Sequence, residues 1–368
     1  MDQRTAAAAA GFDPDRLAEI PRGLQGVVDA GDLSGIVTLL WRRGEVAQIN
    51  TIGRRNVERN LPMERNSLFR IASMSKPITS VAALMLMEEG RFKLDDPIAT
   101  WAPEFAEMRV LDAEDGPLDK THKATKPITF DDLFTHRSGL AYAFTTTGPI
   151  AEAYGKALGD PLASGLDPDE WMRRLAALPL LFEPGDHFHY SHATDVLGFL
   201  VGRIAGKPFR DVLMERIFQP LGMADTDFWA PPQKRDRQAV VYRLDEAAHT
   251  MSPVAFPELT APPAFCGGGG GLISCADDYL RFARMLLNKG ELDGRRYLKA
   301  ETVALMGTNR LTPKQREIPF LGGMSNWKAQ GFGLGVSTVT DPVGILELGI
   351  GSTGSIGWPG AFGTWWQA

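Results

Sequence analysis

The hydrophobic pattern of the first ninety residues changes from a helical period to alternation and back again. A helical period over residues 16–30 gives way to strand-like apolar stretches at 35–41 and 46–52, separated by a polar turn at 42–45. Two such stretches joined by a short turn predict a β-hairpin. A long apolar run at 81–87 then predicts a buried helix.

Helical patterns dominate the middle of the chain, and strand patterns return toward its end. Helices are predicted over 130–134, 168–178, 193–205 and 277–288, and strands near 240–242, over 332–339 and over 344–348. A last strand around Trp365 and Trp366 leaves open whether the sequence continues beyond Ala368.

Strands at both ends with helices between them predict an α/β (α+β) fold of two lobes. Residues 1–115 and 255–368 are expected to form a discontinuous α/β lobe, and residues 116–254 an inserted helical lobe. We expect the active site in the cleft between the two lobes.

Candidate chemistry lies at the start of the helix that contains the 81–87 run, in the segment Ser73-Met74-Ser75-Lys76. Residues three apart share a helix face, so Lys76 Nζ is expected to reach Ser73 Oγ. A serine hydroxyl is too weakly acidic to attack unaided, and a base held against it makes it a nucleophile. The same spacing recurs at Ser325 and Lys328, but in a Gly-rich region with no helical pattern behind it. Ser73 is therefore the predicted nucleophile.

Tyr190 is a candidate partner for this pair. It follows a loop containing Pro184 and Gly185 and precedes an apolar helical stretch, so it is expected to project into the cleft. A phenol beside a serine–lysine pair can relay the proton from nucleophile to leaving group. A purely structural role for a buried tyrosine stays open.

The same region offers a competing metal site. His187, His189 and His192 resemble the H-x-H-x-D-H zinc motif of metallo-β-lactamase-type hydrolases, with His249 downstream as a possible further ligand. Ser191 occupies the aspartate position of that motif, which removes a ligand. Histidines that bind no metal are the simpler interpretation, and we expect no metal.

Two glycine-rich segments suggest nucleotide binding but lack its requirements. The G-x-G-x-x-G pattern at 349–354 is followed by residues that cannot open a helix, and the run 267–271 lacks the Lys-Ser/Thr of a P-loop. Both are predicted to be tight bends or loops where backbone approaches substrate. We therefore expect no cofactor. A Ser-His-Asp arrangement using His136 or His192 has no local support.

Composition narrows the classes of partner. The 368 residues are 44% hydrophobic and 23% charged, with a net charge of -6 and no basic run, which disfavours nucleic acid. No twenty-residue apolar span occurs, so no membrane crossing is expected.

The two cysteines, Cys266 and Cys275, cannot form a disulfide framework, and no secretory signal precedes them, which together predict a cytoplasmic location. The oligomeric state is not predictable.

As a set, these segments resemble the serine β-lactamase and penicillin-binding-protein superfamily, and look closest to the family VIII carboxylesterases, which are similar to class C β-lactamases. The resemblance implies a serine β-lactamase-like fold with an antiparallel sheet flanked by helices and an inserted all-α lobe. Its landmarks cover nearly the whole chain: 69–76, 133–140, 182–185, 190–191, 220–223 and 268–272.

By this resemblance Ser73 is the acylated nucleophile, with Lys76 and Tyr190 as its base and proton relay. The backbone N–H groups of Ser73 and Ala361 would form the oxyanion hole, which stabilises developing negative charge. The third family motif would be Trp358-Pro359-Gly360, on an edge strand facing the nucleophile.

Trp358, Gly360 and His192 are accordingly expected to contact substrate. Two differences from the β-lactamase motifs bear on the class of substrate. His192 stands where they carry the asparagine of Tyr-x-Asn, and Trp358-Pro359 stand where they carry Lys/His-Thr/Ser. The missing cation suits an uncharged ester.

We therefore expect a serine carboxylesterase that hydrolyses small, short-chain esters through an acyl-enzyme. A β-lactamase, a D-amino-acid peptidase or another amide hydrolase on the same fold would also carry these residues. A zinc hydrolase and a non-catalytic scaffold fit the sequence less well.

Overall fold

A computed structural model of the protein describes residues 2–162, 164–320, 327, 329–341 and 351–368. The chain forms two compact units, each assembled from separate segments. Unit 1 comprises residues 1–70, 221–261 and 273–282, and unit 2 comprises residues 71–220, 262–272 and 283–368. The division into lobes at 115/116 and 254/255 stays a prediction.

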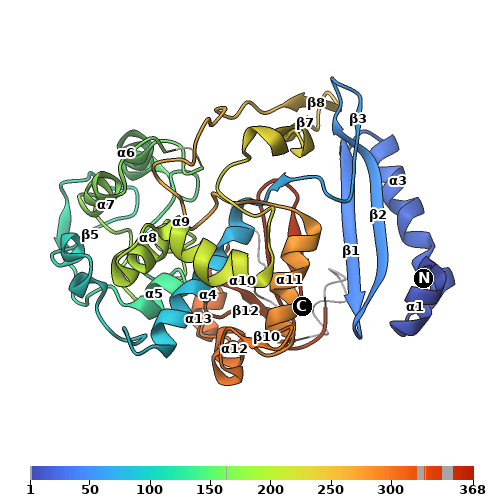
Figure 1. Ribbon diagram of the computed structural model, residues 1–368. Coiled ribbons are helices and arrows are strands. Elements are labelled where there is room, and N and C mark those ends of the chain that lie inside the picture. Colours follow the sequence, from blue (N-terminus) through green and yellow to red (C-terminus); the bar gives the residue numbers. More distant parts are fainter. Residues whose placement is uncertain (1, 163, 321–326, 328, 342–350) are drawn as a thin grey trace. The chain divides into compact units, whose positions relative to one another are not determined.

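Unit 1 is built on the hairpin expected from the sequence. Strands β1 and β2 pair antiparallel from Gly35↔Gly53 to Arg42↔Glu45, and β3 extends the sheet. Helices α1 and α3 pack against β2 (Figure 1). The elements of unit 1 are α1 (Gln3–Ala9), α2 (Pro14–Leu17), α3 (Glu19–Asp29), β1 (Gly35–Arg42), β2 (Glu45–Asn56), β3 (Leu61–Pro62), β4 (Phe69–Arg70), η5 (Pro232–Arg237), β7 (Tyr242–Asp245), β8 (Thr250–Pro253) and β9 (Ile273–Ser274).

Unit 2 has a helical core around α8 (Ala193–Ala205), which contacts α4 (Ser75–Glu88), α5 (Phe130–Phe134) and α9 (Phe209–Leu213) (Figure 1). The apolar run predicted to be a buried helix lies in α4, whose residues are buried from Ser75 to Leu86. The other helices of this unit are η1 (Ala72–Met74), η2 (Ile98–Thr100), η3 (Pro103–Phe105), α6 (Gly148–Leu158), α7 (Pro168–Ala176), η4 (Met214–Phe218), α12 (Ala300–Met306) and α13 (Pro313–Arg316). Two helices, α10 (Gln219–Leu221) and α11 (Ala276–Leu287), cross the boundary between the units.

The strands of unit 2 include a C-terminal antiparallel sheet of order β12-β13-β14-β15. The single strand predicted over 332–339 is wrong, because a turn around Gly335, at φ +82°, divides it into β12 and β13. The strand predicted over 344–348 lies outside the described residues. The strands are β5 (Arg109–Leu111), β6 (Thr121–Lys123), β10 (Glu291–Leu292), β11 (Arg295–Arg296), β12 (Gln330–Phe332), β13 (Ser337–Val339), β14 (Ile356–Pro359) and β15 (Trp365–Gln367).

The position of Trp358 differs from the sequence prediction. Its strand, β14, pairs with β13 on one side and with β15 on the other, so the expected edge strand is an inner strand. Strand β14 also contacts η1, the short helix that contains Ser73. Strand β14 therefore lies against the segment that contains the predicted nucleophile, but as an inner strand of the sheet.

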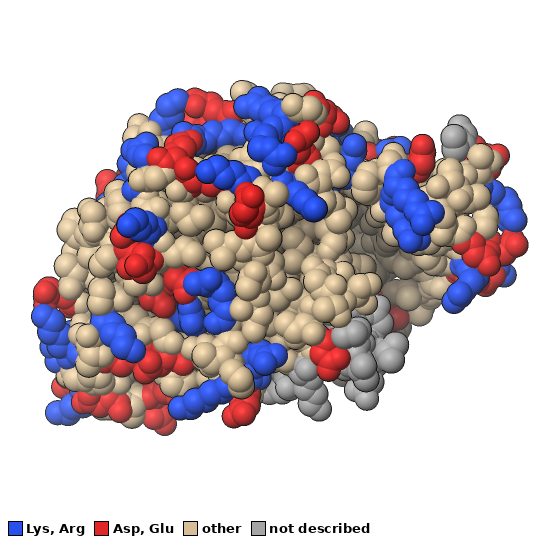
Figure 2. All heavy atoms as spheres, turned by 90° about the horizontal axis from the view of Figure 1, so that it is seen from below, with Lys and Arg blue, Asp and Glu red and all other residues tan. Residues whose placement is uncertain are grey.

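The surface shows no concentration of one charge on the face seen in Figure 2, where acidic and basic side chains alternate. Among the described residues, no helix combines the length and the apolar character needed to cross a bilayer.

Candidate active site

Ser73 lies in the 3-10 turn η1, immediately before α4, and Lys76 lies in the first turn of α4. Lys76 is almost fully buried, and its Nζ lies 3.4 Å from Ser73 Oγ. The predicted serine–lysine proximity is therefore present. The preceding residue, Ala72, is held at φ +42°, in the left-handed region that non-glycine residues rarely adopt. Such strain persists only where the surroundings enforce it.

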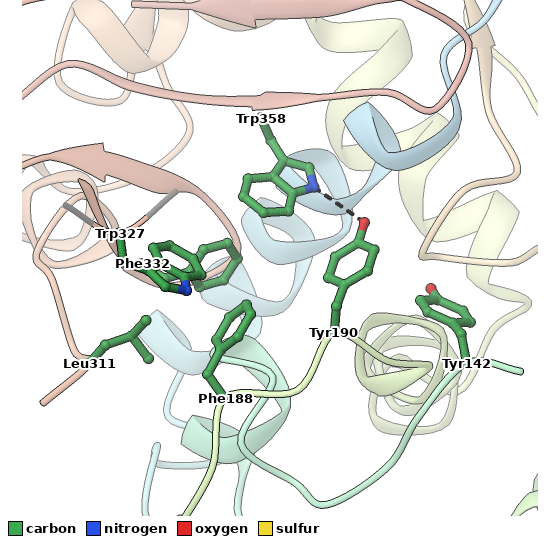
Figure 3. Close-up of a cluster of buried hydrophobic side chains, with 7 residues drawn as sticks. All are labelled: Tyr142, Phe188, Tyr190, Leu311, Trp327, Phe332 and Trp358. Carbon is green, nitrogen blue, oxygen red and sulfur yellow. Dashed lines mark hydrogen bonds between the residues drawn. The ribbon is translucent and has the colours of Figure 1, made fainter. Parts of the chain in front are cut away.

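Tyr190 also contacts Ser73, the predicted nucleophile. Its hydroxyl lies 2.7 Å from Ser73 Oγ and accepts a hydrogen bond from Trp358 Nε1 at 3.3 Å (Figure 3). Lys76 Nζ lies 4.5 Å from the centroid of the Tyr190 ring. Tyr190 and Trp358 belong to a buried cluster in unit 2 that also contains Tyr142, Phe188, Leu311, Trp327 and Phe332. The cluster fixes the direction of the phenol.

Lys76 has two further partners that sequence reasoning missed. Its Nζ donates to the Gly269 carbonyl oxygen at 2.6 Å and to the Tyr142 hydroxyl at 3.3 Å. Burial, together with the nearby Asp195 carboxylate, raises the pKa of Tyr142 well above its usual value, so this hydroxyl keeps its proton. The signal in the sequence was weak: Tyr142 follows the 133–140 landmark by two residues, and Gly269 lies in the glycine run.

His192 and Asp195 both contact Tyr142. His192 Nδ1 lies 2.9 Å from Asp195 Oδ2, and the Tyr142 hydroxyl donates to the same oxygen at 3.3 Å. The sequence indicates Asp195 only as a residue that favours the start of a helix, and it does lie in the first turn of α8. His192 is 3% exposed. Its contact with substrate stays a prediction.

The turn between β14 and β15 contains Gly360 and Ala361. A Cβ at Gly360 would meet the Ile71 carbonyl oxygen at 2.3 Å, so this turn lies against the segment that leads into Ser73. Within the described part of the chain, the N–H groups of Ser73 and Ala361 donate to no protein acceptor. Two unused donors suit an oxyanion hole, and that role stays a prediction.

The histidines of the competing zinc hypothesis have separate surroundings. His187 stacks on Phe182, His189 Nε2 lies 3.1 Å from Thr145 Oγ1, and His192 pairs with Asp195. Across the residues that the structure describes, no group of three or more His, Cys, Asp or Glu side chains could hold a metal ion.

The contacts of Ser73 also bear on a Ser-His-Asp arrangement. In such an arrangement the nucleophile would contact a histidine, but the hydrogen bonds of Ser73 Oγ are to Lys76 and Tyr190. His136 Nδ1 faces Ser191 instead, at 3.2 Å from its Oγ. The second serine–lysine pair, Ser325 and Lys328, lies outside the described residues.

Comparison with known proteins decides the family. A family model described as Beta-lactamase matches residues 21–368. The chain belongs to the beta-lactamase family. Protein Rv1367c of Mycobacterium tuberculosis is 50% identical to it over 343 residues, covering 93% of this chain and 84% of that protein. Esterase EstB of Burkholderia gladioli is 31% identical over 350 residues, covering 91% and 82%.

Solved structures agree with the assignment to the beta-lactamase family. One described as EstCE1, a hydrolase with promiscuous acyltransferase activity, matches with a TM-score of 0.79 at 29% identity, over 95% of this chain and 90% of that one. Simvastatin synthase (LovD) from Aspergillus terreus, in a mutant form, matches with a TM-score of 0.77 at 25% identity, over 97% and 89%. The predicted serine β-lactamase-like fold is confirmed, and so is the resemblance to the esterase branch. This member of the beta-lactamase family is a serine hydrolase.

Proposed function

We propose that the protein hydrolyses small, short-chain carboxylic esters through an acyl-enzyme on Ser73. The observation that carries this proposal is the convergence of Tyr190 and Lys76 on one hydroxyl, at 2.7 and 3.4 Å. A serine flanked by two groups that can exchange protons with it has the arrangement of an activated nucleophile. The similarity to an esterase and to a hydrolase supports the choice of reaction.

In the proposed first step, Ser73 Oγ attacks the ester carbonyl carbon while its proton passes to the Tyr190–Lys76 pair. The carbonyl oxygen becomes an oxyanion, which the N–H groups of Ser73 and Ala361 would stabilise. The C–O bond to the alcohol then breaks, and the same pair returns the proton to the departing alkoxide. Attack of water on the acyl-enzyme releases the carboxylic acid and restores Ser73.

The neighbours of the nucleophile favour an uncharged substrate. Trp358 and Pro359 occupy the strand β14 positions where β-lactam-binding relatives carry a cation and a hydroxyl, and Trp358 is buried against Tyr190. An indole offers apolar contact in place of a cation that would bind a carboxylate. We therefore rank esters above β-lactams and other amides.

The test compares hydrolysis of p-nitrophenyl acetate and butyrate with hydrolysis of a chromogenic cephalosporin. Ser73→Ala is expected to lower ester turnover by about 10³-fold or more, and a chelator is expected to leave it unchanged. The control is Ser138→Ala, which removes the hydroxyl of another serine of the same unit. Ser138 is fully buried, whereas Ser73 is half-buried, and among the hydrogen bonds of the described residues Ser138 Oγ accepts from Leu140 N at 3.4 Å and has none with Lys76 or Tyr190. Full ester turnover in Ser73→Ala would refute the proposal, and faster cephalosporin than ester turnover would favour a β-lactamase.

Acyl transfer to an alcohol is a second candidate reaction, because two solved structures similar to this chain are described as an acyltransferase-active hydrolase and a simvastatin synthase. In this reaction an alcohol replaces water in the attack on the acyl-enzyme. Adding methanol to the p-nitrophenyl butyrate assay would then yield methyl butyrate, which gas chromatography detects. Butyrate alone as the product would leave hydrolysis as the activity.

A further inference from the structure

A buried carboxylate, Asp195, lies beside the candidate active site and accepts three hydrogen bonds. Its side chain is 2% exposed. Oδ1 accepts from Gly269 N at 2.7 Å, and Oδ2 accepts from His192 Nδ1 at 2.9 Å and from the Tyr142 hydroxyl at 3.3 Å. Three donors directed at one carboxylate suit its ionised form, which only accepts hydrogen bonds.

Two of these donors connect Asp195 to Lys76. Gly269 donates its N–H to Asp195, and its carbonyl oxygen accepts from Lys76 Nζ at 2.6 Å. Tyr142 donates its hydroxyl hydrogen to Asp195 and accepts from Lys76 Nζ at 3.3 Å. The position of the lysine head group therefore depends on where the carboxylate holds the glycine and the phenol.

His192 is the third donor, and it has no direct contact with Lys76 or Ser73 among the hydrogen bonds of the described residues. Its ring packs edge-on against Tyr142 at 4.2 Å and Trp171 at 5.3 Å, and parallel to Tyr154 at 6.0 Å between ring centroids. The titratable groups that face it are thus Asp195, Tyr142 and Tyr154. Since an ionised carboxylate cannot donate, the shared hydrogen is carried by His192 Nδ1.

We infer that His192 is a positioning residue, which holds Asp195 in the orientation that places Lys76 against Ser73. The inference rests on the proposed function, since it assigns His192 a part in the activation of Ser73. It differs from the direct substrate contact expected from the sequence, because it acts on the turnover step and not on substrate binding. Loss of the Nδ1 hydrogen bond would leave Oδ2 with only the longer hydrogen bond from Tyr142, so the carboxylate would be held less firmly even though Gly269 N still donates to Oδ1.

Two amide substitutions test the inference with matched polarity. In His192→Asn the amide nitrogen takes about the position of Nδ1 and can still donate to Asp195. In His192→Gln the amide lies one bond farther out, near the position of Nε2. Removing a hydrogen bond to a charged group predicts that kcat for p-nitrophenyl butyrate falls about 10- to 100-fold in His192→Gln. We expect His192→Asn to retain most of kcat, and KM to stay close to the wild-type value in both.

A control separates this effect from general destabilisation. Tyr154→Phe removes the phenol oxygen that accepts a hydrogen bond from Ala141 N, in the same aromatic surroundings but outside the Asp195 network. It is expected to lower the melting temperature without lowering kcat. If His192→Gln does not fold, the inference is tested by comparing kcat of His192→Asn with kcat of Tyr142→Phe. An equal fall of kcat in these two variants would overturn the inference.

The remaining outcomes also decide the question. Equal kcat for the Asn and Gln variants, or a raised KM with kcat preserved, would overturn the positioning role, and the second result would favour substrate contact. Ser73→Ala, measured in the same assay, distinguishes a failure of the proposed function from a failure of this inference. If Ser73→Ala abolishes turnover and His192→Gln leaves kcat unchanged, only the inference fails.

Discussion

Gly269→Ala is the most discriminating single substitution that the structure suggests, because one methyl group would disturb both connections between Asp195 and Lys76. A Cβ at this position would lie 2.6 Å from the Tyr142 hydroxyl and 2.9 and 3.0 Å from the two Asp195 oxygens. Ordinary van der Waals contact begins near 3.4 Å. The backbone itself is no obstacle, since φ at Gly269 lies outside the left-handed region.

The expected magnitude follows from the bonds at risk. The Lys76–Tyr142 and Tyr142–Asp195 hydrogen bonds are already 3.3 Å long, so a shift of a few tenths of an ångström takes them beyond hydrogen-bonding distance. A hydrogen bond to a charged group contributes about 1.5–3 kcal/mol. If that stabilisation is lost from the transition state, kcat falls about 10- to 150-fold.

The assay is the initial rate of p-nitrophenyl butyrate hydrolysis, with the melting temperature measured on the same preparations. Gly155→Ala is the control, because Gly155 lies in α6 and an added Cβ there would meet no atom within 4 Å apart from its chain neighbours and the nearby backbone of its own helix. There alanine should be neutral or should stabilise by about 0.5–1 kcal/mol. Wild-type kcat in Gly269→Ala, or an equal loss in Gly155→Ala, would refute the reasoning.

Two further predictions concern the phenol and the buried histidines. Trp358→Phe keeps an aromatic ring in the cluster but removes the indole N–H that donates to the Tyr190 hydroxyl. Because one hydrogen bond to the phenol is lost, kcat should fall about 3- to 10-fold. An unchanged kcat would show that this hydrogen bond does not contribute to turnover. Burial lowers the pKa of His189 to about 4 and that of His136 well below 6.5, so the unfolded chain binds more protons than the folded one between pH 6.5 and 4. Stability is therefore lost as the pH falls through this window, by about 3 kcal/mol for His189. A melting temperature that does not fall from pH 6.5 to 4, or that falls as steeply in His189→Gln, would contradict this.

The features that the sequence predicted well are those with local causes. The hairpin of β1 and β2 and the helix α8 follow from the periodicity of neighbouring residues, and α8 spans the predicted 193–205. The approach of Lys76 to Ser73 follows from a spacing of three residues at the start of a helix. Tyr190 was located by its place after a Pro-Gly loop, and its hydroxyl does contact Ser73.

The features that the sequence did not reveal depend on contacts between distant segments. Tyr142 is 66 residues from Lys76, and Gly269 is 193 residues from it. Asp195 resembles any acidic residue that favours a helix start, and nothing near it in the sequence indicates that Gly269 will donate to it. The glycine run was expected to form a tight bend or a loop where backbone approaches substrate. That expectation did not include the hydrogen bonds by which Gly269 joins Asp195 to Lys76. Neither the local pattern nor the spacing of residues contains this information.

The left-handed conformation of Ala72 has a consequence for engineering this protein. An alanine held at φ +42° costs about 1–2 kcal/mol relative to an unstrained residue, so a screen for thermostable variants would readily select Ala72→Gly. Glycine would also free the peptide that carries the Ser73 N–H, which the proposed oxyanion hole needs in a fixed position. Thermostability and catalytic rate therefore favour different residues at position 72, and a library that varies it should be screened for both.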